Sequence, residues 1–479
     1  NYNVVVGDEA GTALTTGDSN IAIGFEALKT EDANSFNVAV GHQALKVNNG
    51  GDANVAIGYQ ALTANTTANN NVAVGNGALA ANTTGALNVA VGAAAGEAFT
   101  EGGDNVALGY NALTADTLGS RSTALGRSTL QNQNFTTATN AYNVAIGYAA
   151  GDAVTTGVQN TLVGALAGDA ITTGFANVAI GYQALSSDDV GTNTVAIGQN
   201  ALFAQNFSTA TAAHNVAVGQ SAGASVTTGI RNTLIGALAG DALTDADFNV
   251  AIGEGALSAD TLGSKSIAIG VNALNEQNFT TSTNALNVAI GHLAGAAVTT
   301  AVQNTLIGAL SGDALTQGAR NTTLGYLSLT SDTMGQYAVA IGYNALATQN
   351  FTTATNNYNI GIGYAAGEAV TTGFQNTLVG GLAGDALTDA DFNTVLGYAA
   401  LTSDTLGSSS VAIGRHALLS QNFTTATNTY NTAVGESAGQ AVTTGTDNTF
   451  VGGLCGDGTD DGGNNTAMGA AALSANCGS

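Results

Sequence analysis

The sequence of 479 residues contains no proline and no tryptophan, only two cysteines and only 9% charged residues. Without proline, proline-rich linkers between domains are excluded. The cysteines, Cys455 and Cys477, both lie near the end of the sequence, so neither a disulfide framework nor a CxxC metal knuckle supports the rest of the chain. No apolar run approaches the roughly 20 residues that span a bilayer, and we therefore expect no membrane insertion.

Basic side chains are also scarce. Eight Lys and Arg against 33 Asp and Glu give a net charge of −25, which repels phosphate backbones and anionic membranes. We therefore expect no nucleic-acid partner. The Gly-x-Ser-x-Gly pattern at 219–223 does not predict a hydrolase, because other repeats carry Ala149 or Leu293 in place of the serine. We expect no enzymatic activity and no cofactor.

One pattern, Asn-Val-Ala-Ile-Gly, does recur from end to end, and its glycine marks 27 repeats. From Gly7 to Gly126 this glycine recurs at a constant step of 17 along the chain. From Gly126 onward, three steps of 17 alternate with one of 21, so a superrepeat runs from Gly126 to Gly198 and begins again there. We predict one continuous domain over 1–479, with regular rungs in 1–125 and four-rung superrepeats in 126–479, and further domains beyond its ends.

Positions within a repeat are counted here from this glycine, and each position has its own chemistry. Position −1 is aliphatic in all 27 copies, which predicts a continuous buried spine. Position −4 is Asn in 22 copies and position +3 is Ala in 23, which predicts a ladder of hydrogen-bonded amides and a site of close packing. Position +4 is either Leu or Gly, which suggests two types of turn filling one space. Representative ladder residues are Asn54, Asn71 and Asn88, Gly58, Gly75 and Gly92, and Ala61, Ala78 and Ala95.

Short β-branched bursts bounded by Gly, Asn, Thr and Asp are typical of strands and turns. A repeat of this length is too short for a helical hairpin, but it can form one rung of a β-solenoid with two short strands and two turns. The fold class predicted is therefore all-β, a parallel β-roll of about 27 rungs.

The chain is 44% hydrophobic with a mean hydropathy of +0.17, although a slender solenoid exposes much of its surface. Alternation places positions −1 and −3 on one face of the strand and position −2 on the other, so both faces are apolar. One face fills the rung, and the other is expected to meet another copy of the chain. The simplest such assembly is a homotrimer around an axis parallel to the solenoid.

The longer intervals carry a nearly identical loop of sequence Gln-Asn-Phe-Thr-Thr, with Ser in place of the first Thr in one copy. Its aromatic ring among amides and hydroxyls suggests a glycan contact, and the alternative is that each ring packs against the chain and anchors the longer turn. The five rings are Phe135, Phe207, Phe279, Phe351 and Phe423.

Acidic residues in stacked turns can bind calcium, and the densest candidates are Asp457, Asp460 and Asp461. The alternative is that they are ordinary turn-forming residues, and we expect no metal. An ice-binding solenoid is another alternative, but Thr pairs such as Thr155-Thr156 occur in only some rungs.

The stretch from Asn54 to Ala61 resembles the head repeat of trimeric autotransporter adhesins, the YadA-like head. It resembles even more closely the repeat arrays in tail fibres of bacteriophages, particularly marine ones. This resemblance covers nearly the whole chain and implies a homotrimeric β-roll shaft that projects a host receptor-binding tip from the virion. The alternative it implies is a bacterial surface adhesin or extracellular filament that binds glycans. The family has no catalytic residues to transfer.

Overall fold

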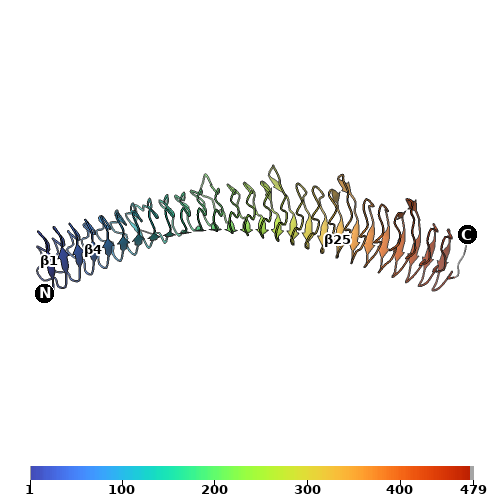
Figure 1. Ribbon diagram of the computed structural model, residues 1–479, viewed down its shortest axis with the longest axis horizontal. Coiled ribbons are helices and arrows are strands. Elements are labelled where there is room, and N and C mark those ends of the chain that lie inside the picture. Colours follow the sequence, from blue (N-terminus) through green and yellow to red (C-terminus); the bar gives the residue numbers. More distant parts are fainter. Residues whose placement is uncertain (1, 475–479) are drawn as a thin grey trace. The chain divides into compact units, whose positions relative to one another are not determined.

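A computed structural model describes residues 2–474 and divides the chain into two compact units, 1–237 and 238–479. Each unit is a parallel β-solenoid, and no helix occurs among residues 2–474. The structure has about 27 rungs, one for each recurrence of the glycine, so the predicted fold class is confirmed. In Figure 1 each large arrow is the strand of one rung, and within each unit the arrows of consecutive rungs lie side by side.

Every rung contributes one strand of three residues, at positions −3 to −1. In the first unit these strands are β1 (Val4–Val6), β2 (Ile21–Ile23), β3 (Val38–Val40), β4 (Val55–Ile57), β5 (Val72–Val74), β6 (Val89–Val91), β7 (Val106–Leu108), β9 (Thr123–Leu125), β11 (Val144–Ile146), β12 (Thr161–Val163), β13 (Val178–Ile180), β14 (Val195–Ile197), β15 (Val216–Val218) and β16 (Thr233–Ile235). In the second unit they are β17 (Val250–Ile252), β19 (Ile267–Ile269), β21 (Val288–Ile290), β22 (Thr305–Ile307), β23 (Thr322–Leu324), β25 (Val339–Ile341), β27 (Ile360–Ile362), β28 (Thr377–Val379), β29 (Thr394–Leu396), β31 (Val411–Ile413), β33 (Thr432–Val434), β34 (Thr449–Val451) and β35 (Thr466–Met468).

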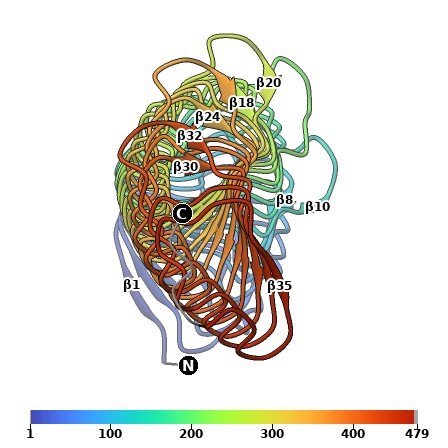
Figure 2. The same cartoon turned by 90° about the vertical axis from the view of Figure 1, so that its right-hand side faces the viewer.

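The pairing register follows the glycine spacing. Val55 pairs with Val72 across the shorter interval, and Thr123 pairs with Val144 across the longer one. The additional residues of the longer interval therefore lie outside the sheet, in a loop, and like residues remain stacked. Loops preceding β10 (Thr139–Asn140) and β20 (Thr283–Asn284) project outward from the rungs in Figure 2.

The prediction of a second strand in every rung is wrong. Among residues 2–474, a second strand forms only beside four of the insertions, in two-residue parallel pairs, and an isolated bridge joins Thr192 to Ala212 beside the fifth. These pairs are β8 (Gly119–Ser120) with β10, β18 (Gly263–Ser264) with β20, β24 (Gly335–Gln336) with β26 (Thr355–Asn356), and β30 (Gly407–Ser408) with β32 (Thr427–Asn428).

Elsewhere the rungs are joined by backbone hydrogen bonds that do not form strands. The N–H of Leu45 donates to the carbonyl of Ala61 in the next rung (3.1 Å), and the N–H of Gln60 donates to the carbonyl of His42 in the previous rung (2.9 Å). Both donor residues have a left-handed backbone conformation, with φ of +49° at Leu45 and +53° at Gln60. Left-handed residues let the chain turn while its N–H groups still point along the stack, a conformation that costs a non-glycine residue roughly 1–2 kcal/mol.

The recurrent glycine allows neighbouring rungs to approach closely. Gly75 has a φ of +144°, and a Cβ added to it would lie 2.3 Å from the carbonyl oxygen of Gly92. The same contact recurs at Gly58, where the oxygen belongs to Gly75 and lies 2.4 Å away. Both the conformation and the space therefore require glycine.

The position −1 column is not the buried spine that the sequence suggested. Its aliphatic side chains face outward, and Ile57, for example, is 40% exposed. The fully buried column is position −2, which Ala56 and Ala73 occupy in the neighbouring strands β4 and β5. The alternation along the strand was predicted correctly, and the smaller side chains of the strand, at position −2, lie in the interior.

Leu and Gly at position +4 do not mark two turn conformations, because both are left-handed (φ +51° at Leu62 and +61° at Gly151). The space beside a glycine at +4 is filled from other positions, which agrees with the prediction of one space filled from different sides. One source is the apolar residue at +7, since a Cβ on Gly96 would lie 2.7 Å from the ring of Phe99.

The other source is a large residue at position −2. A Cβ on Gly151 or Gly168 would lie 2.6 or 2.7 Å from the side chain of Leu162, which replaces the usual Ala between them. A leucine at −2 therefore requires glycine at +4 in its own rung and in the preceding rung.

Replacing Gly75 by Ala is expected to open the surrounding rungs. Left-handed strain and the clash with the Gly92 carbonyl together should lower the local free energy of opening by about 3 kcal/mol. Hydrogen exchange of the amides in residues 72–92 measures this change. Gly77→Ala is the matched control, because a Cβ there meets only Glu97, at 3.7 Å, and should cost about 1 kcal/mol. Equal losses of protection in the two variants would contradict the close-approach role.

Candidate functional site

The predicted asparagine ladder is present, but it joins each side chain to the backbone. The N–H of Asn71 donates to Oδ1 of Asn54 (3.0 Å), and the N–H of Asn88 donates to Oδ1 of Asn71 (2.9 Å). Each Nδ2 donates to a carbonyl 14 residues later, as from Asn71 to Gly85 (2.9 Å). All three asparagines are fully buried, so the ladder pairs backbone groups that would otherwise be left without partners.

The alanine column at +3 also lies in the interior, and Ala61, Ala78 and Ala95 are fully buried. Cys455 takes the same place in its rung, is buried, and donates from its thiol to the carbonyl of Ala467 (3.2 Å). Cys477 lies outside the described residues. The column is therefore a packing feature of the solenoid.

Position +7 is apolar in most rungs with glycine at +4, but among residues 2–474, where +4 is leucine, it carries buried polar side chains, whose burial sequence reasoning missed. Asn65 donates from Nδ2 to Oδ1 of Asn48 (2.6 Å), and Asn82 does the same to Asn65 (3.1 Å). This series of polar residues begins at Glu31, which accepts from Nδ2 of Asn48. The recurrence of Asn at one position in three successive repeats is the signal that could have revealed it.

Beside each insertion the +7 column carries a buried carboxylate. Oδ1 of Asp116 accepts from the backbone N–H of Gly119 (3.0 Å) and of Phe135 (3.2 Å). Its Oδ2 accepts from Nε2 of Gln133 in the next rung (2.5 Å). The carboxylate thus fixes both the turn that follows it and the start of the inserted loop.

The glutamine continues the network into the asparagine ladder. Gln133 also donates to Oγ of Ser122 (3.1 Å), and its Oε1 accepts from Nδ2 of Asn143 (2.8 Å). Ser122 is one of the residues that replace Asn at −4, so the glutamine connects the ladder where the insertion interrupts it. The same Asp–Gln contact recurs at Asp188–Gln205, Asp260–Gln277, Asp332–Gln349 and Asp404–Gln421.

Burial raises the pKa of four of these carboxyls above the ordinary value. The affected residues are Asp116, Asp188, Asp260 and Asp332. Hydrogen bonds from the glutamine and from backbone N–H groups oppose the rise, because they favour the charged form. Since the partners of the Asp116 carboxyl are all donors, the carboxylate form fits the geometry.

The loop phenylalanines lie in the interior. Phe135, Phe207, Phe279, Phe351 and Phe423 are only 4–7% exposed. This placement agrees with the alternative in which each ring anchors the longer turn. The exposed part of the loop consists of polar residues such as Thr136 and Thr137. A ring face for stacking on a sugar is therefore covered by the chain, and we do not assign these rings a glycan contact.

The acidic residues near the end of the second unit do not form a common site. Oδ1 of Asp460 accepts from the N–H of Asp461 (2.7 Å), whereas Oδ1 of Asp457 is buried without a hydrogen-bond partner. Within residues 2–474, no group of three or more His, Cys, Asp or Glu side chains is arranged to hold a metal ion. The same residues contain no helix long and apolar enough to cross a membrane.

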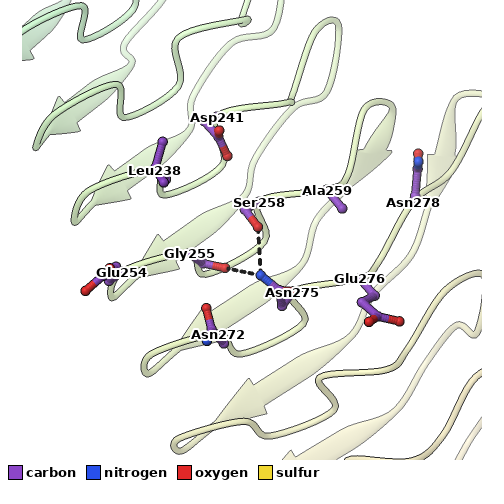
Figure 3. A pocket seen from close by; sticks show the side chains of 10 residues that line it. All are labelled: Leu238, Asp241, Glu254, Gly255, Ser258, Ala259, Asn272, Asn275, Glu276 and Asn278. Atoms are coloured by element: carbon purple, nitrogen blue, oxygen red, sulfur yellow. Dashed lines mark hydrogen bonds between the residues drawn. The ribbon is translucent and has the colours of Figure 1, made fainter.

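The second unit has a surface depression of about 360 Å³ (Figure 3). Asp241, Glu254 and Glu276 line it together with asparagines. Asn275 donates to the carbonyl of Gly255 (3.2 Å) and to Oγ of Ser258 (2.8 Å). The lining contains no histidine, cysteine or basic side chain.

The outward face of the sheet is another surface feature of each unit. We call the side chains at positions −3 and −1 of the three-residue strands the outer strip. It consists only of Val, Ile, Leu, Thr and Met, and no charged residue occurs in any of these strands between residues 2 and 474. Exposed fractions of 38% at Val91 and 43% at Leu125 show that these side chains remain partly open in the single chain.

No protein-family model matches this chain, and no curated protein sequence matches it. The likeness of residues 54–61 to adhesin and tail-fibre repeats therefore stays a prediction from the sequence.

Replacing Gln133 by Met is expected to destabilise the first insertion turn. Methionine keeps the length of the side chain but cannot donate to Asp116 or accept from Asn143, both of which are buried. Buried groups left without partners should cost about 3 kcal/mol, seen as faster hydrogen exchange of the Gly119 and Phe135 amides. Thr137→Ala, in the exposed part of the same loop, should change these rates little. Unchanged exchange in the Gln133 variant would contradict the network.

Lowering the pH is expected to stabilise the insertion turns. A folded carboxyl pKa above the unfolded value means that the folded state binds the proton more tightly. The contribution of this carboxyl to the free energy of unfolding is therefore greatest below its pKa in the unfolded chain, near 3.8. That contribution is lost as the pH rises through the raised pKa of the folded state. Thermal unfolding between pH 7 and pH 4 should show a smaller gain in a variant with the four affected Asp changed to Asn. Four exposed acidic residues changed to their amides control for the fall in net charge, and an equal gain in all three proteins would contradict the assignment.

Proposed function

We propose that this chain is the shaft of a homotrimeric extracellular fibre, most similar to a bacteriophage tail fibre that projects a host receptor-binding tip. The observation that carries the proposal is the outer strip, which follows every rung and is uncharged. A chain with a net charge of −25 places no charge on this face, so copies can approach there without meeting like charges.

The regular spacing of apolar side chains along the outer strip favours a second copy of the same chain as the binding partner. Apolar side chains recur at every rung, at the spacing that the repeat sets. A globular partner would cover only a few rungs, whereas a chain with the same period covers the strip along each unit. Closed symmetry around an axis parallel to the solenoid uses the same face of every copy, and a trimer is the simplest such ring beyond a dimer.

A bacterial trimeric surface adhesin is the alternative, supported by the likeness of residues 54–61 to the adhesin head repeat. Antibodies raised against the chain and used to label the source material in electron microscopy distinguish the two. Labelled fibres on virions support the tail-fibre proposal. Labelled bacterial surfaces would replace it with the adhesin.

Charge placed on the outer strip is expected to weaken association. At micromolar concentration the wild type should sediment with about three times the chain mass of 46.9 kDa. Ile57→Glu with Val74→Glu places like charges where the copies meet and should shift the protein toward monomer, because burying unpaired charges is costly. Thr67→Glu, in an exposed loop, is the control and should leave the mass unchanged. A monodisperse wild-type monomer would contradict the proposal.

A further inference from the structure

The outer strip cannot by itself determine how two copies align along the solenoid. Position −1 is apolar in every rung and position −3 is only Val, Ile or Thr, so a shift of one rung places apolar side chains at −1 on apolar side chains again. The apolar area buried by association hardly changes with such a shift. A uniform interface therefore permits slippage unless other residues break the repeat.

Two exposed columns next to the strip do break the repeat. They are position +1, just beyond the strip on one side, and position −5, just beyond it on the other, and we call them the rails. The five rungs that carry the insertions show the contrast, because their loops repeat almost verbatim while their rails differ. Position +1 of these rungs is Arg127, Gln199, Val271, Tyr343 and Arg415. Position −5 is Arg121, Asn193, Lys265, Tyr337 and Ser409.

Side chains on the +1 rail form ordered stacks from rung to rung. The ring of His42 lies 5.1 Å from that of Phe25 and 5.2 Å from that of Tyr59. The Arg127 guanidinium lies 5.8 Å from the rings of both Tyr110 and Tyr148. Tyr59 is 50% exposed and Tyr148 is 53% exposed, so these stacks present surface as well as contact one another.

The −5 rail has stacks of the same kind. Arg121 lies 5.7 Å from the Tyr142 ring and donates to its hydroxyl (2.8 Å), and in the second unit the rings of Tyr337 and Tyr358 are 5.3 Å apart. Stacking restricts the rotamers of these side chains, so less entropy is lost when they contact a partner. A partner displaced by one rung would face a different side chain at every such place.

We propose that the rails set the axial register between copies of this chain, and that the partner they select is a second copy aligned at one fixed offset. The outer strip supplies the apolar contact, and the rails make one alignment more favourable than those shifted by a rung. Polar and charged residues that fix the register of coiled coils act by the same principle. This inference depends on the self-association proposed above.

The experiment compares the wild type with a variant whose rails are uniform. In the variant every residue at +1 becomes Gln and every residue at −5 becomes Asn, the residues that the rails already carry at Gln199 and Asn193. A photo-crosslinking amino acid replaces Val74 in one sample and Ile307 in another. Mass spectrometry of the crosslinked peptides then gives the residue numbers of the partner. A control variant changes only the exposed loop residues Thr136 and Thr137 to Ala.

In the wild type and in the control, crosslinks are expected at a single partner rung for each probe. In the uniform-rail variant, still associated by sedimentation, they are expected at two or more partner rungs in comparable yield, separated by one repeat. Several partner rungs in the associated wild type, or a single one in the uniform-rail variant, would overturn the register role while leaving self-association intact. A monomeric wild type would overturn self-association and the register role together.

Discussion

The structure depends on hydrogen bonding between backbone groups one repeat apart. Val55 pairs with Val72 in the sheet, and Leu45 donates to Ala61 where no strand forms, so the same spacing operates all around the rung. Every repeat must therefore hold the same number of residues or place its extra residues outside the stack. The glycine column follows from this constraint, because only glycine allows a backbone to lie against the next rung at Gly75 and Gly92.

Much of the fold could be predicted from the sequence because stacking makes chemically equivalent positions meet. The period is too short for helices, and the Asn, Ala and Gly columns each mark a place where a rung contacts its neighbours. The insertions were correctly separated from the rung, since the glycine spacing resumes after each of them. Self-association could only be expected from the number of apolar residues, and the sequence alone did not locate the face.

Other features could not be predicted because they depend on which way a side chain points. Both faces of the strand are apolar, so alternation separates the side chains into two sets but does not tell which set lies inside. Position −1 was therefore wrongly placed in the interior. The polar column at +7 was missed because buried Asp116 and Gln133 resemble ordinary turn residues. For the same reason, the phenylalanine rings of the inserted loops could be interpreted either as a glycan contact or as an anchor of the longer turn. In the structure the N–H of Phe135 donates to the buried carboxylate of Asp116, and the Phe135 ring lies in the interior.

The interior and the exterior of the solenoid differ in the size of their apolar side chains. The interior strand position holds mostly alanine, whereas valine and isoleucine, which gain more from burial, lie on the outer strip. Hydrogen-bonded ladders such as Asn54 to Asn88 therefore carry a larger share of the stability of a single chain than in a protein with a large apolar core. The apolar surface that would ordinarily form a core remains available, and burying it between copies would stabilise the rungs that present it. A solenoid built in this way would gain stability at every rung that it shared with another copy.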